Sequence, residues 1–143
     1  MIRIRDVMNP DVVVVGPEWT VEQTIEFLTE HHIGGSPVVN ESGELVGMIS
    51  ELALIDVVFD HSIKYAPISK YMNRELQKVA ADDSLTRAAQ LFALYSFRRL
   101  PVVENDSLVG IITRRDLMNY SLRSCHAVED PLVAMIPSLA AIS

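Results

Sequence analysis

The segment from Gly110 to Leu117 combines a hydroxyl residue and an acid at a spacing that suits ligand binding. An apolar strand is expected to end at Thr113, and Asp116 follows in the first turn of a helix. A helix N-terminus offers unpaired N–H groups to an anion, and a carboxylate there can accept two hydrogen bonds from a vicinal diol. The segment therefore predicts a site for a sugar with an attached oxyanion. The simpler alternative is that Thr113 caps the helix and Asp116 stabilises its dipole.

Two adjacent arginines, Arg98 and Arg99, precede a second apolar strand. Adjacent strand residues point to opposite faces, so only one of the two can point fully outward. The other needs an anionic partner, and the planar guanidinium group suits phosphate. A salt bridge to an internal carboxylate, or a solvated strand edge, explains the pair equally well.

The elements that would position these residues occur twice in the chain. A shift of 64 residues places 8–9 on 72–73, both Met-Asn, and 37–39 on 101–103, both Pro-Val-Val. A shift of 63 then places 45–47 on 108–110, both Leu-Val-Gly. The lost residue falls in a polar turn, where a deletion is cheapest. The ordered matches predict one structural unit used twice.

Each copy predicts the element order β-α-β-β-α. Short β-branched runs at 12–15 and 76–79 lead to Thr20 or Ser84, which are typical helix N-caps. Helical spacing follows, then two strands joined by a polar turn, and a closing helix. The predicted strands and closing helices cover 36–39, 45–49, 51–59, 100–103, 108–112 and 114–122.

These elements predict an α/β (α+β) fold in which two repeats pack sheet to sheet with pseudo-two-fold symmetry and a cleft between them. A single copy would be marginal alone, whereas two can share a core. The first repeat is expected to cover residues 1–62 and the second 63–123. Residues 124–143 form an apolar tail interrupted by prolines, which we expect to pack on the repeats or on a second chain.

The first copy has Gly34 and Gly35 where the second has its two arginines. Glycine lets a ligand approach the backbone closely or permits positive φ. One copy therefore offers cationic side chains, and the other offers bare backbone.

The two copies together resemble a pair of cystathionine-β-synthase (CBS) domains, also called a Bateman module. The resemblance covers roughly residues 1 to 123. The segments that carry it are Met8, Val12–Val15, Ser36–Val39, Leu45–Ser50, Tyr71–Met72, Arg99–Val103 and Leu108–Asp116. It implies a non-catalytic energy or metabolite sensor that binds an adenine nucleotide (AMP, ADP or ATP) as a regulatory ligand. S-adenosylmethionine is an alternative ligand, and no cofactor is required.

The resemblance also implies roles for individual residues. Asp116 matches the ribose-binding acid of the family, and Thr113 matches its hydroxyl partner. The residues expected to contact the base are Val13, Ile33, Gly34, Gly35 and Ile111. The residues expected to meet the phosphates are Arg98, Arg99 and Arg115.

The other cleft departs from the family pattern. Its motif reads Ser50-Glu51-Leu52-Ala53, with Ala53 in the place of the acid. Without a carboxylate to hold the ribose, this cleft is predicted to be weak or empty. The residues expected to line it are Ser50, Met72, Gln77 and Phe97.

Composition narrows the possible partners. The 143 residues are 49% hydrophobic and carry a net charge of −7. The negative charge disfavours nucleic acid and anionic membranes as partners. No apolar run approaches the roughly 18 residues of a membrane span, and the first residues lack a signal-peptide core, so the sequence predicts a cytoplasmic chain. The single Cys125 excludes an internal disulfide. The sequence shows no nucleophile–base pair and no set of metal ligands, so it does not predict an enzyme.

We therefore expect a homodimer that shifts conformation on binding an adenosine-containing small molecule and acts on an unidentified regulated protein. The alternative is a ligand-free structural or protein-interaction module that serves dimerisation.

Overall fold

The structure, a computed structural model, describes residues 1–124, and the predictions for the tail from 125 onward lie outside the described residues. The chain forms two compact units. Unit 1 comprises Met1–Pro10, Lys78–Val103 and the described residues from Val109 onward. Unit 2 comprises Asp11–Gln77 and Glu104–Leu108. The repeat boundaries 1–62 and 63–123 stay a prediction about the sequence, because the two units interleave segments from both repeats.

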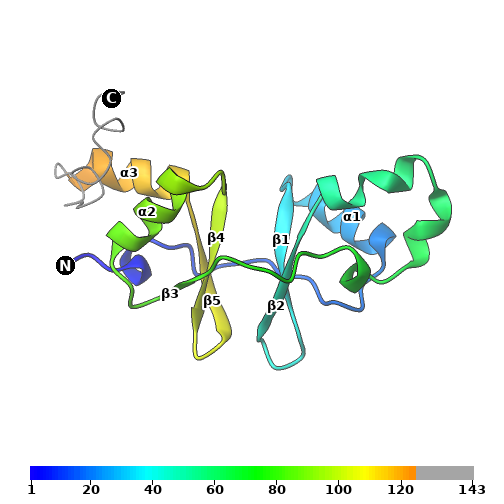
Figure 1. The fold of residues 1–143 in the computed structure, drawn as a ribbon, viewed down its shortest axis with the longest axis horizontal. Coiled ribbons are helices and arrows are strands. Elements are labelled where there is room, and N and C mark those ends of the chain that lie inside the picture. The colour runs from blue at the N-terminus through cyan, green and yellow to red at the C-terminus, as the bar shows by residue number, and fades with distance from the viewer. Residues whose placement is uncertain (125–143) are drawn as a thin grey trace. The chain divides into compact units, whose positions relative to one another are not determined.

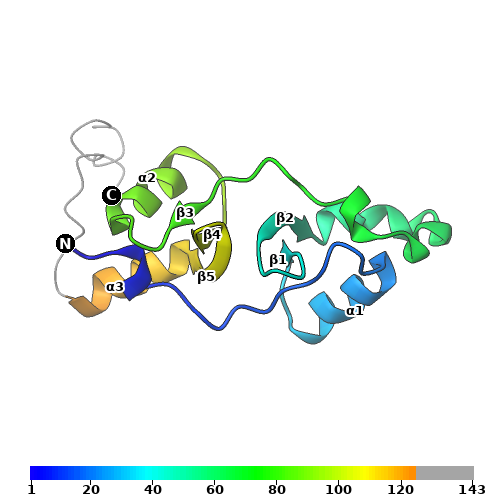
Figure 2. The ribbon, with the colours of Figure 1, turned by 90° about the horizontal axis from the view of Figure 1, so that it is seen from below.

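Unit 1 is a small sheet with two helices on one face (Figures 1 and 2). The strands β3 (Val79–Ala80), β4 (Arg99–Glu104) and β5 (Ser107–Thr113) follow the order β3-β4-β5, and β3 runs parallel to β4. The helices are α2 (Leu85–Leu94) and α3 (Arg114–Ser124). The core includes Ile4, Val79, Ala81, Leu85, Ala88, Leu91, Leu100, Val102 and Ile112.

The turn between β4 and β5 has the backbone conformation of a tight two-residue hairpin. Asn105 and Asp106 both have positive φ, 52° and 66°. Two consecutive residues of this kind form the turn whose twist matches the flanking strands, and Asn and Asp tolerate it best after glycine.

Unit 2 contains α1 (Val21–Glu30), β1 (Gly35–Val39) and β2 (Leu45–Ser50), followed by three short 3-10 helices. These are η2 (Leu52–Val58), η3 (His61–Tyr65) and η4 (Ile68–Lys70). The two strands pair antiparallel, and α1 and η2 lie on the same face of them (Figures 1 and 2). The mixed α/β fold predicted from the two repeats is confirmed.

Several local predictions need correction. The predicted strand 12–15 is reduced to one parallel bridge, between Val15 and Val38. The predicted helix 51–59 is the 3-10 helix η2, in a segment whose β-branched residues lower helix propensity. The segment 60–69, which joins the two repeats, contributes to the core through Ile68, which is fully buried and whose N–H donates to the Trp19 carbonyl at 2.8 Å.

The two predicted N-caps differ in the structure. The Thr20 hydroxyl accepts from the Gln23 N–H, and the Gln23 side chain accepts from the Thr20 N–H, which is a complete capping box. Ser84 occupies the N-cap position of α2, but its side chain makes no capping hydrogen bond. The Leu85 N–H at the start of α2 donates to the Ile2 carbonyl at 3.0 Å, and the Val21 N–H at the start of α1 donates in the same way to the Ala66 carbonyl at 2.9 Å. Each helix start is therefore bonded to a segment distant in the sequence, whether or not its N-cap side chain makes a bond.

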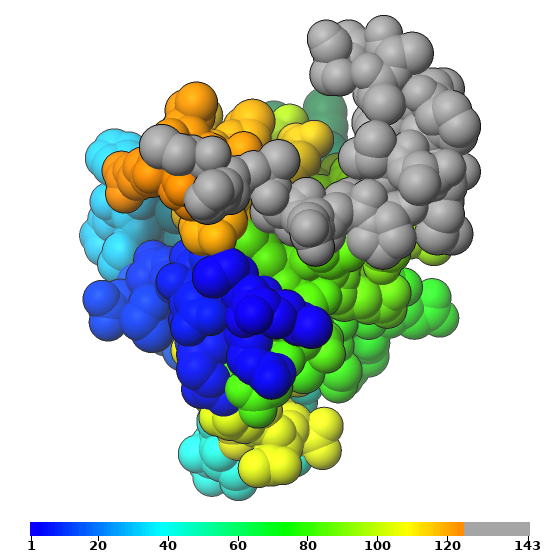
Figure 3. Space-filling model, turned by 90° about the vertical axis from the view of Figure 1, so that its left-hand side faces the viewer, coloured from blue at the N-terminus to red at the C-terminus, as the bar shows by residue number. Residues whose placement is uncertain are grey.

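The N-terminal segment is built into unit 1. Ile4 is fully buried, and its N–H donates to the Asp83 carbonyl at 2.9 Å. Arg5 pairs with Asp82 at 3.1 Å. Figure 3 shows this segment (blue) lying against the green residues that lead into α2.

Each unit has the same pairing between one of its strands, β5 in unit 1 and β2 in unit 2, and a Met-Asn segment. In unit 1, Asn9 and Ile111 exchange two backbone hydrogen bonds of 2.8 and 3.0 Å. In unit 2, Asn73 and Met48 do the same, also at 2.8 and 3.0 Å. Asn9 belongs to the first copy of the repeat and pairs with a strand of the second, whereas Asn73 belongs to the second copy and pairs with a strand of the first. This exchange is the reason the compact units interleave the sequence.

The part of the chain that the structure describes has no helix that is both long and apolar enough to cross a membrane.

Candidate functional site

Thr113 and Asp116 form a reciprocal pair at the start of α3 in unit 1. The Thr113 N–H donates to Asp116 Oδ2 at 2.8 Å, and the Asp116 N–H donates to the Thr113 hydroxyl oxygen at 3.1 Å. This geometry is a helix cap, so the simpler interpretation of the segment describes the structure correctly. It does not exclude a ligand, because each group keeps hydrogen-bonding capacity.

The remaining capacity suits a sugar with an attached anion. Among residues 1–124, no donor bonds to Asp116 Oδ1, and the Thr113 hydroxyl proton is not used by its bond to the Asp116 N–H. A carboxylate oxygen can accept from ribose hydroxyls, and a hydroxyl can donate to a phosphate. Both side chains are partly exposed, so solvent or a ligand can reach them.

Asp116 also lines a polar cavity of about 240 Å³ in unit 1. The α3 residues that line it, at positions 116, 119, 120 and 123, share one face of the helix because three- and four-residue steps return to the same side. Asp6 and Val7 close it from the N-terminal segment. Asn119, Tyr120 and Arg123 were not among the residues predicted for the site, although their helical spacing from Asp116 was a usable signal. Asp6 could not be found this way, because only the tertiary fold brings it to α3.

The other predicted residues of unit 1 lie at the ends of the strands. Arg98 is exposed just before β4, and Arg99 is the first residue of β4 and half-buried. Ile111 lies in β5 next to the buried Ile112, and Arg115 is exposed in the first turn of α3. Thr113, Arg115 and Asp116 are thus brought together by one strand–helix junction.

The predicted base-contacting residues of unit 2 are also neighbours. The Ile33 N–H donates to the Leu28 carbonyl at the end of α1, and Gly34 and Gly35 lead into β1. Val13 is 39% exposed, and its carbonyl accepts from the Ser36 hydroxyl at 3.2 Å. The Gly34 carbonyl accepts from the Glu51 N–H at 3.0 Å. Neither glycine has positive φ, so neither is required by a left-handed backbone.

The equivalent junction in unit 2 lacks the acid. The Ala53 N–H donates to the Ser50 hydroxyl oxygen at 3.3 Å, as the Asp116 N–H does to Thr113. Ala53 offers no carboxylate for the return bond or for a ligand. Among the residues predicted for the weaker cleft, Met72 is buried and Ser50 and Gln77 are exposed.

A metal centre finds no support in residues 1–124, where no group of three or more His, Cys, Asp or Glu side chains could hold an ion.

Comparison with known proteins supports the resemblance found in the sequence. A family model described as "CBS domain" matches twice, over residues 4–60 and 68–123. The chain is 33% identical over 118 residues to a CBS domain-containing protein, YhcV, of Bacillus subtilis, covering 82% of this chain and 84% of that protein. It is 31% identical over 117 residues to an A-adding tRNA nucleotidyltransferase of Aquifex aeolicus, covering 82% of this chain but 14% of that enzyme.

The fold also matches a solved structure. A crystal structure of CBSX2 of Arabidopsis thaliana in complex with AMP superposes with a TM-score of 0.78 at 29% identity. The match covers 88% of this chain and all of that one.

Proposed function

Because the chain belongs to the CBS domain family, we propose that it is a regulatory module that binds an adenosine-containing ligand, with AMP, ADP and ATP as the first candidates. The observation that carries the proposal is the Thr113–Asp116 pair, which keeps one carboxylate oxygen and one hydroxyl proton available for a ligand. The similarity to CBSX2, whose structure contains AMP, supports the same ligand class.

Each part of the proposed ligand, the ribose, the phosphates and the base, is contacted by a different group of the predicted residues. Asp116 accepts hydrogen bonds from the ribose diol, and Thr113 donates to a phosphate oxygen. The guanidinium groups proposed for the phosphates are those of Arg98, Arg99 and Arg115. The residues proposed for the base are Val13, Ile33, Gly34, Gly35 and Ile111.

The proposed action is regulatory. The ligand favours one conformation of a homodimeric module, and a regulated protein responds to that conformation. The chain itself contributes binding energy and no catalytic step.

One observation favours the alternative, a ligand-free interaction module. The Thr113–Asp116 pair is already complete as a helix cap, so the fold alone accounts for both residue types.

Thermal unfolding with and without nucleotide distinguishes the two functions. AMP, ADP, ATP and S-adenosylmethionine are each added at about 1 mM. A ligand with a Kd of about 10 μM should stabilise the chain by about 2.7 kcal/mol, which is a shift of several degrees. Calorimetric titration should then give one ligand per chain, because the Ser50–Ala53 junction lacks the acid.

The decisive variant is Asp116→Asn, because an amide oxygen can still accept from the Thr113 N–H and preserve the cap. Its melting temperature without ligand should stay near that of the wild type, while the ligand-induced shift is lost. Glu75→Gln, which removes one exposed carboxylate elsewhere, is the matched control and should keep the shift. If no nucleotide stabilises the wild type, the interaction module is favoured. If Asp116→Asn binds as the wild type does, the site lies elsewhere.

A further inference from the structure

The cavity beside α3 in unit 1, which we call the α3 cavity, is lined mainly by charged and polar side chains. The residues that line it are Asp6, Val7, Asp116, Asn119, Tyr120 and Arg123. Its volume of about 240 Å³ lies below the roughly 300–1,000 Å³ of pockets that hold drug-sized ligands. The α3 cavity therefore suits a small polar molecule.

Charges of both signs line the α3 cavity without pairing with each other. Within residues 1–124, the Arg123 guanidinium group forms no ion pair with Asp6 or Asp116, and the Asn119 amide group has no hydrogen-bond partner. Asp6 Oδ2 accepts from the Arg3 N–H at 3.0 Å, which leaves Asp6 Oδ1 without a donor in the same part of the chain. Opposite charges that line one space and stay apart leave room for a molecule that carries both.

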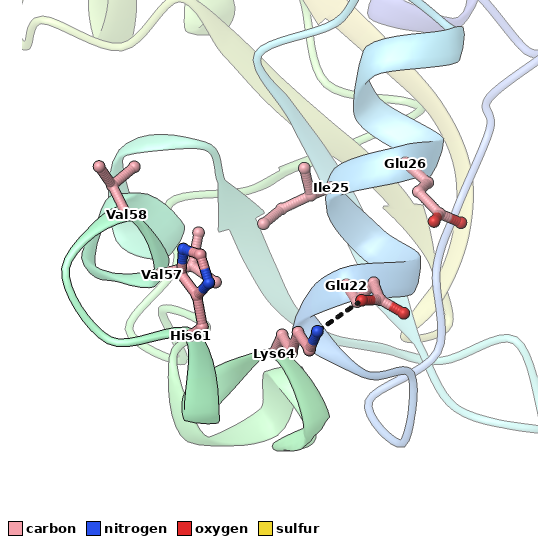
Figure 4. A pocket seen from close by; sticks show the side chains of 7 residues that line it. All are labelled: Glu22, Ile25, Glu26, Val57, Val58, His61 and Lys64. Atoms are coloured by element: carbon pink, nitrogen blue, oxygen red, sulfur yellow. Dashed lines mark ion pairs between the residues drawn. The ribbon is translucent and has the colours of Figure 1, made fainter.

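The larger cavity of unit 2 differs in this respect. It has a volume of about 430 Å³ and lies between α1 and the 3-10 helices η2 and η3 (Figure 4). Its walls include the apolar residues Ile25, Val57 and Val58, and Lys64 pairs there with Glu22 at 3.8 Å. The lysine of this cavity thus already has an acidic partner, whereas the arginine of the α3 cavity has none among the described residues.

The equivalent position in the first copy of the repeat shows what a purely structural role looks like. The shift of 63 residues places Asp60 on Arg123. The Asp60 carboxylate accepts from the Ser62 N–H at 3.0 Å and from the Ser62 hydroxyl at 2.6 Å, and so caps η3. Arg123 lies in the last turn of α3, where the helix dipole favours a cation. The dipole does not require that this cation line a cavity together with Asp6.

The charges of the α3 cavity disfavour two simple classes of ligand. The carboxylates of Asp6 and Asp116 repel a phosphate or another plain anion, and the guanidinium group of Arg123 repels a plain cation. A zwitterion suits both signs, because its carboxylate can pair with a guanidinium group and its ammonium group can donate to a carboxylate. An α-amino acid carries these two groups on one carbon, which also suits the small volume.

We propose that the α3 cavity binds a free α-amino acid with an uncharged side chain. The ammonium group of the ligand donates to Asp6 Oδ1, the oxygen that the Arg3 N–H does not use. The carboxylate of the ligand accepts from the Arg123 guanidinium group and from the Asn119 amide group.

The proposed amino-acid site goes beyond the proposed nucleotide function and does not depend on it. The charge of Asp116 adds to the attraction for the ammonium group, but the ligand makes no hydrogen bond to it. Asp116 Oδ1 and the Thr113 hydroxyl proton therefore keep the roles proposed for the ribose and the phosphate.

Thermal unfolding with free amino acids tests for binding. Each of the uncharged protein amino acids is added at about 10 mM, without nucleotide. An amino acid present at about ten times its Kd should raise Tm by about 4 °C. Calorimetric titration with the best of them should give one ligand per chain. The proposal is wrong if none of them raises Tm or gives a binding heat.

Analogues of the best amino acid test whether both of its charged groups are needed. Its methyl ester lacks the carboxylate, and its N-acetyl derivative lacks the ammonium group. Each analogue should bind at least tenfold more weakly than the amino acid, because one of the two charge-assisted contacts is lost. An analogue that binds as well as the parent would show that the opposed charges of the cavity do not hold the ligand.

Two variants test the residues. Asp6→Asn and Arg123→Gln each remove one charge, and the asparagine oxygen can still accept from the Arg3 N–H. Each variant should raise the Kd of the amino acid about tenfold or more and keep the wild-type Tm without ligand. Arg114→Gln, at an exposed position of α3 outside the cavity, is the matched control and should bind normally. Unchanged binding in both variants would place the amino acid elsewhere and overturn the proposal.

The Asp116→Asn variant separates this site from the nucleotide site. It should abolish the shift caused by nucleotide and weaken the amino acid much less than Asp6→Asn does. The reverse order, with the larger loss in Asp116→Asn, would contradict the contact proposed for Asp6. If amino acids bind as expected and no nucleotide does, the proposed nucleotide function fails while the amino-acid site stands.

Discussion

Gly110 is a position where close packing limits the residue type. A Cβ added there would lie 2.5 Å from Met8 Sδ, 3.0 Å from Met8 Cγ and 3.1 Å from the Asn9 carbonyl oxygen. The methionine side chain is flexible, but Asn9 is held by its two backbone hydrogen bonds to Ile111. Forcing an extra methyl group into close packing costs about 1–3 kcal/mol. We expect Gly110→Ala to cost about 2 kcal/mol, and so to lower Tm by about 6 °C.

A Met8 variant tests whether close packing against Met8 causes this loss of stability. Met8→Ala removes the sulfur that the new methyl group would meet, so Gly110→Ala should cost clearly less in a Met8→Ala background. A double-mutant cycle from urea unfolding measures the difference. The control is Gly43→Ala, where φ is +81° and nothing lies within 4 Å of the new Cβ. Its cost arises from backbone strain, so Met8→Ala should not change it. An equal cost of Gly110→Ala in both backgrounds would refute the packing argument.

Three further predictions concern stability and are measured by urea unfolding. Thr20→Ala removes the hydroxyl that accepts from the Gln23 N–H and should cost about 1 kcal/mol. Ile68→Ala opens a cavity at a fully buried side chain and should cost about 3 kcal/mol; a negligible cost would show that the joining segment is not part of the core. Asp106→Gly relieves a φ of +66° and should leave stability unchanged or slightly raised, whereas a marked loss would show that the aspartate side chain stabilises the turn.

The elements near the site were predictable because their signals are local. The strand that ends at Thr113 and the helix that begins at Arg114 follow from an apolar run and a hydroxyl residue three positions before an acid. The helix α1 follows from its apolar spacing and the Thr20 cap. Each of these patterns lies within one turn or one strand, where neighbouring residues alone set the conformation.

Predictions did not reach the contacts that distant segments supply. The first N–H of each helix donates to a carbonyl far along the chain, Val21 to Ala66 and Leu85 to Ile2. The cavity beside Asp116 depends on Asp6, which the chain brings to α3 from more than a hundred residues away. No spacing rule relates such residues, since their proximity depends on how the whole unit packs.

The sequence by itself determined that the chain is a tandem repeat of a mixed α/β unit, and that only its second copy carries the Thr–Asp pair. Tertiary structure decided which segments of the two repeats pair. The Met8-Asn9 segment pairs with a strand of the second copy, and the Met72-Asn73 segment pairs with a strand of the first. The physical reason is that β-pairing satisfies backbone groups of any residue, so the partner is chosen by packing. At Gly110 and Gly47, the absence of a side chain leaves space for Met8 and Met72.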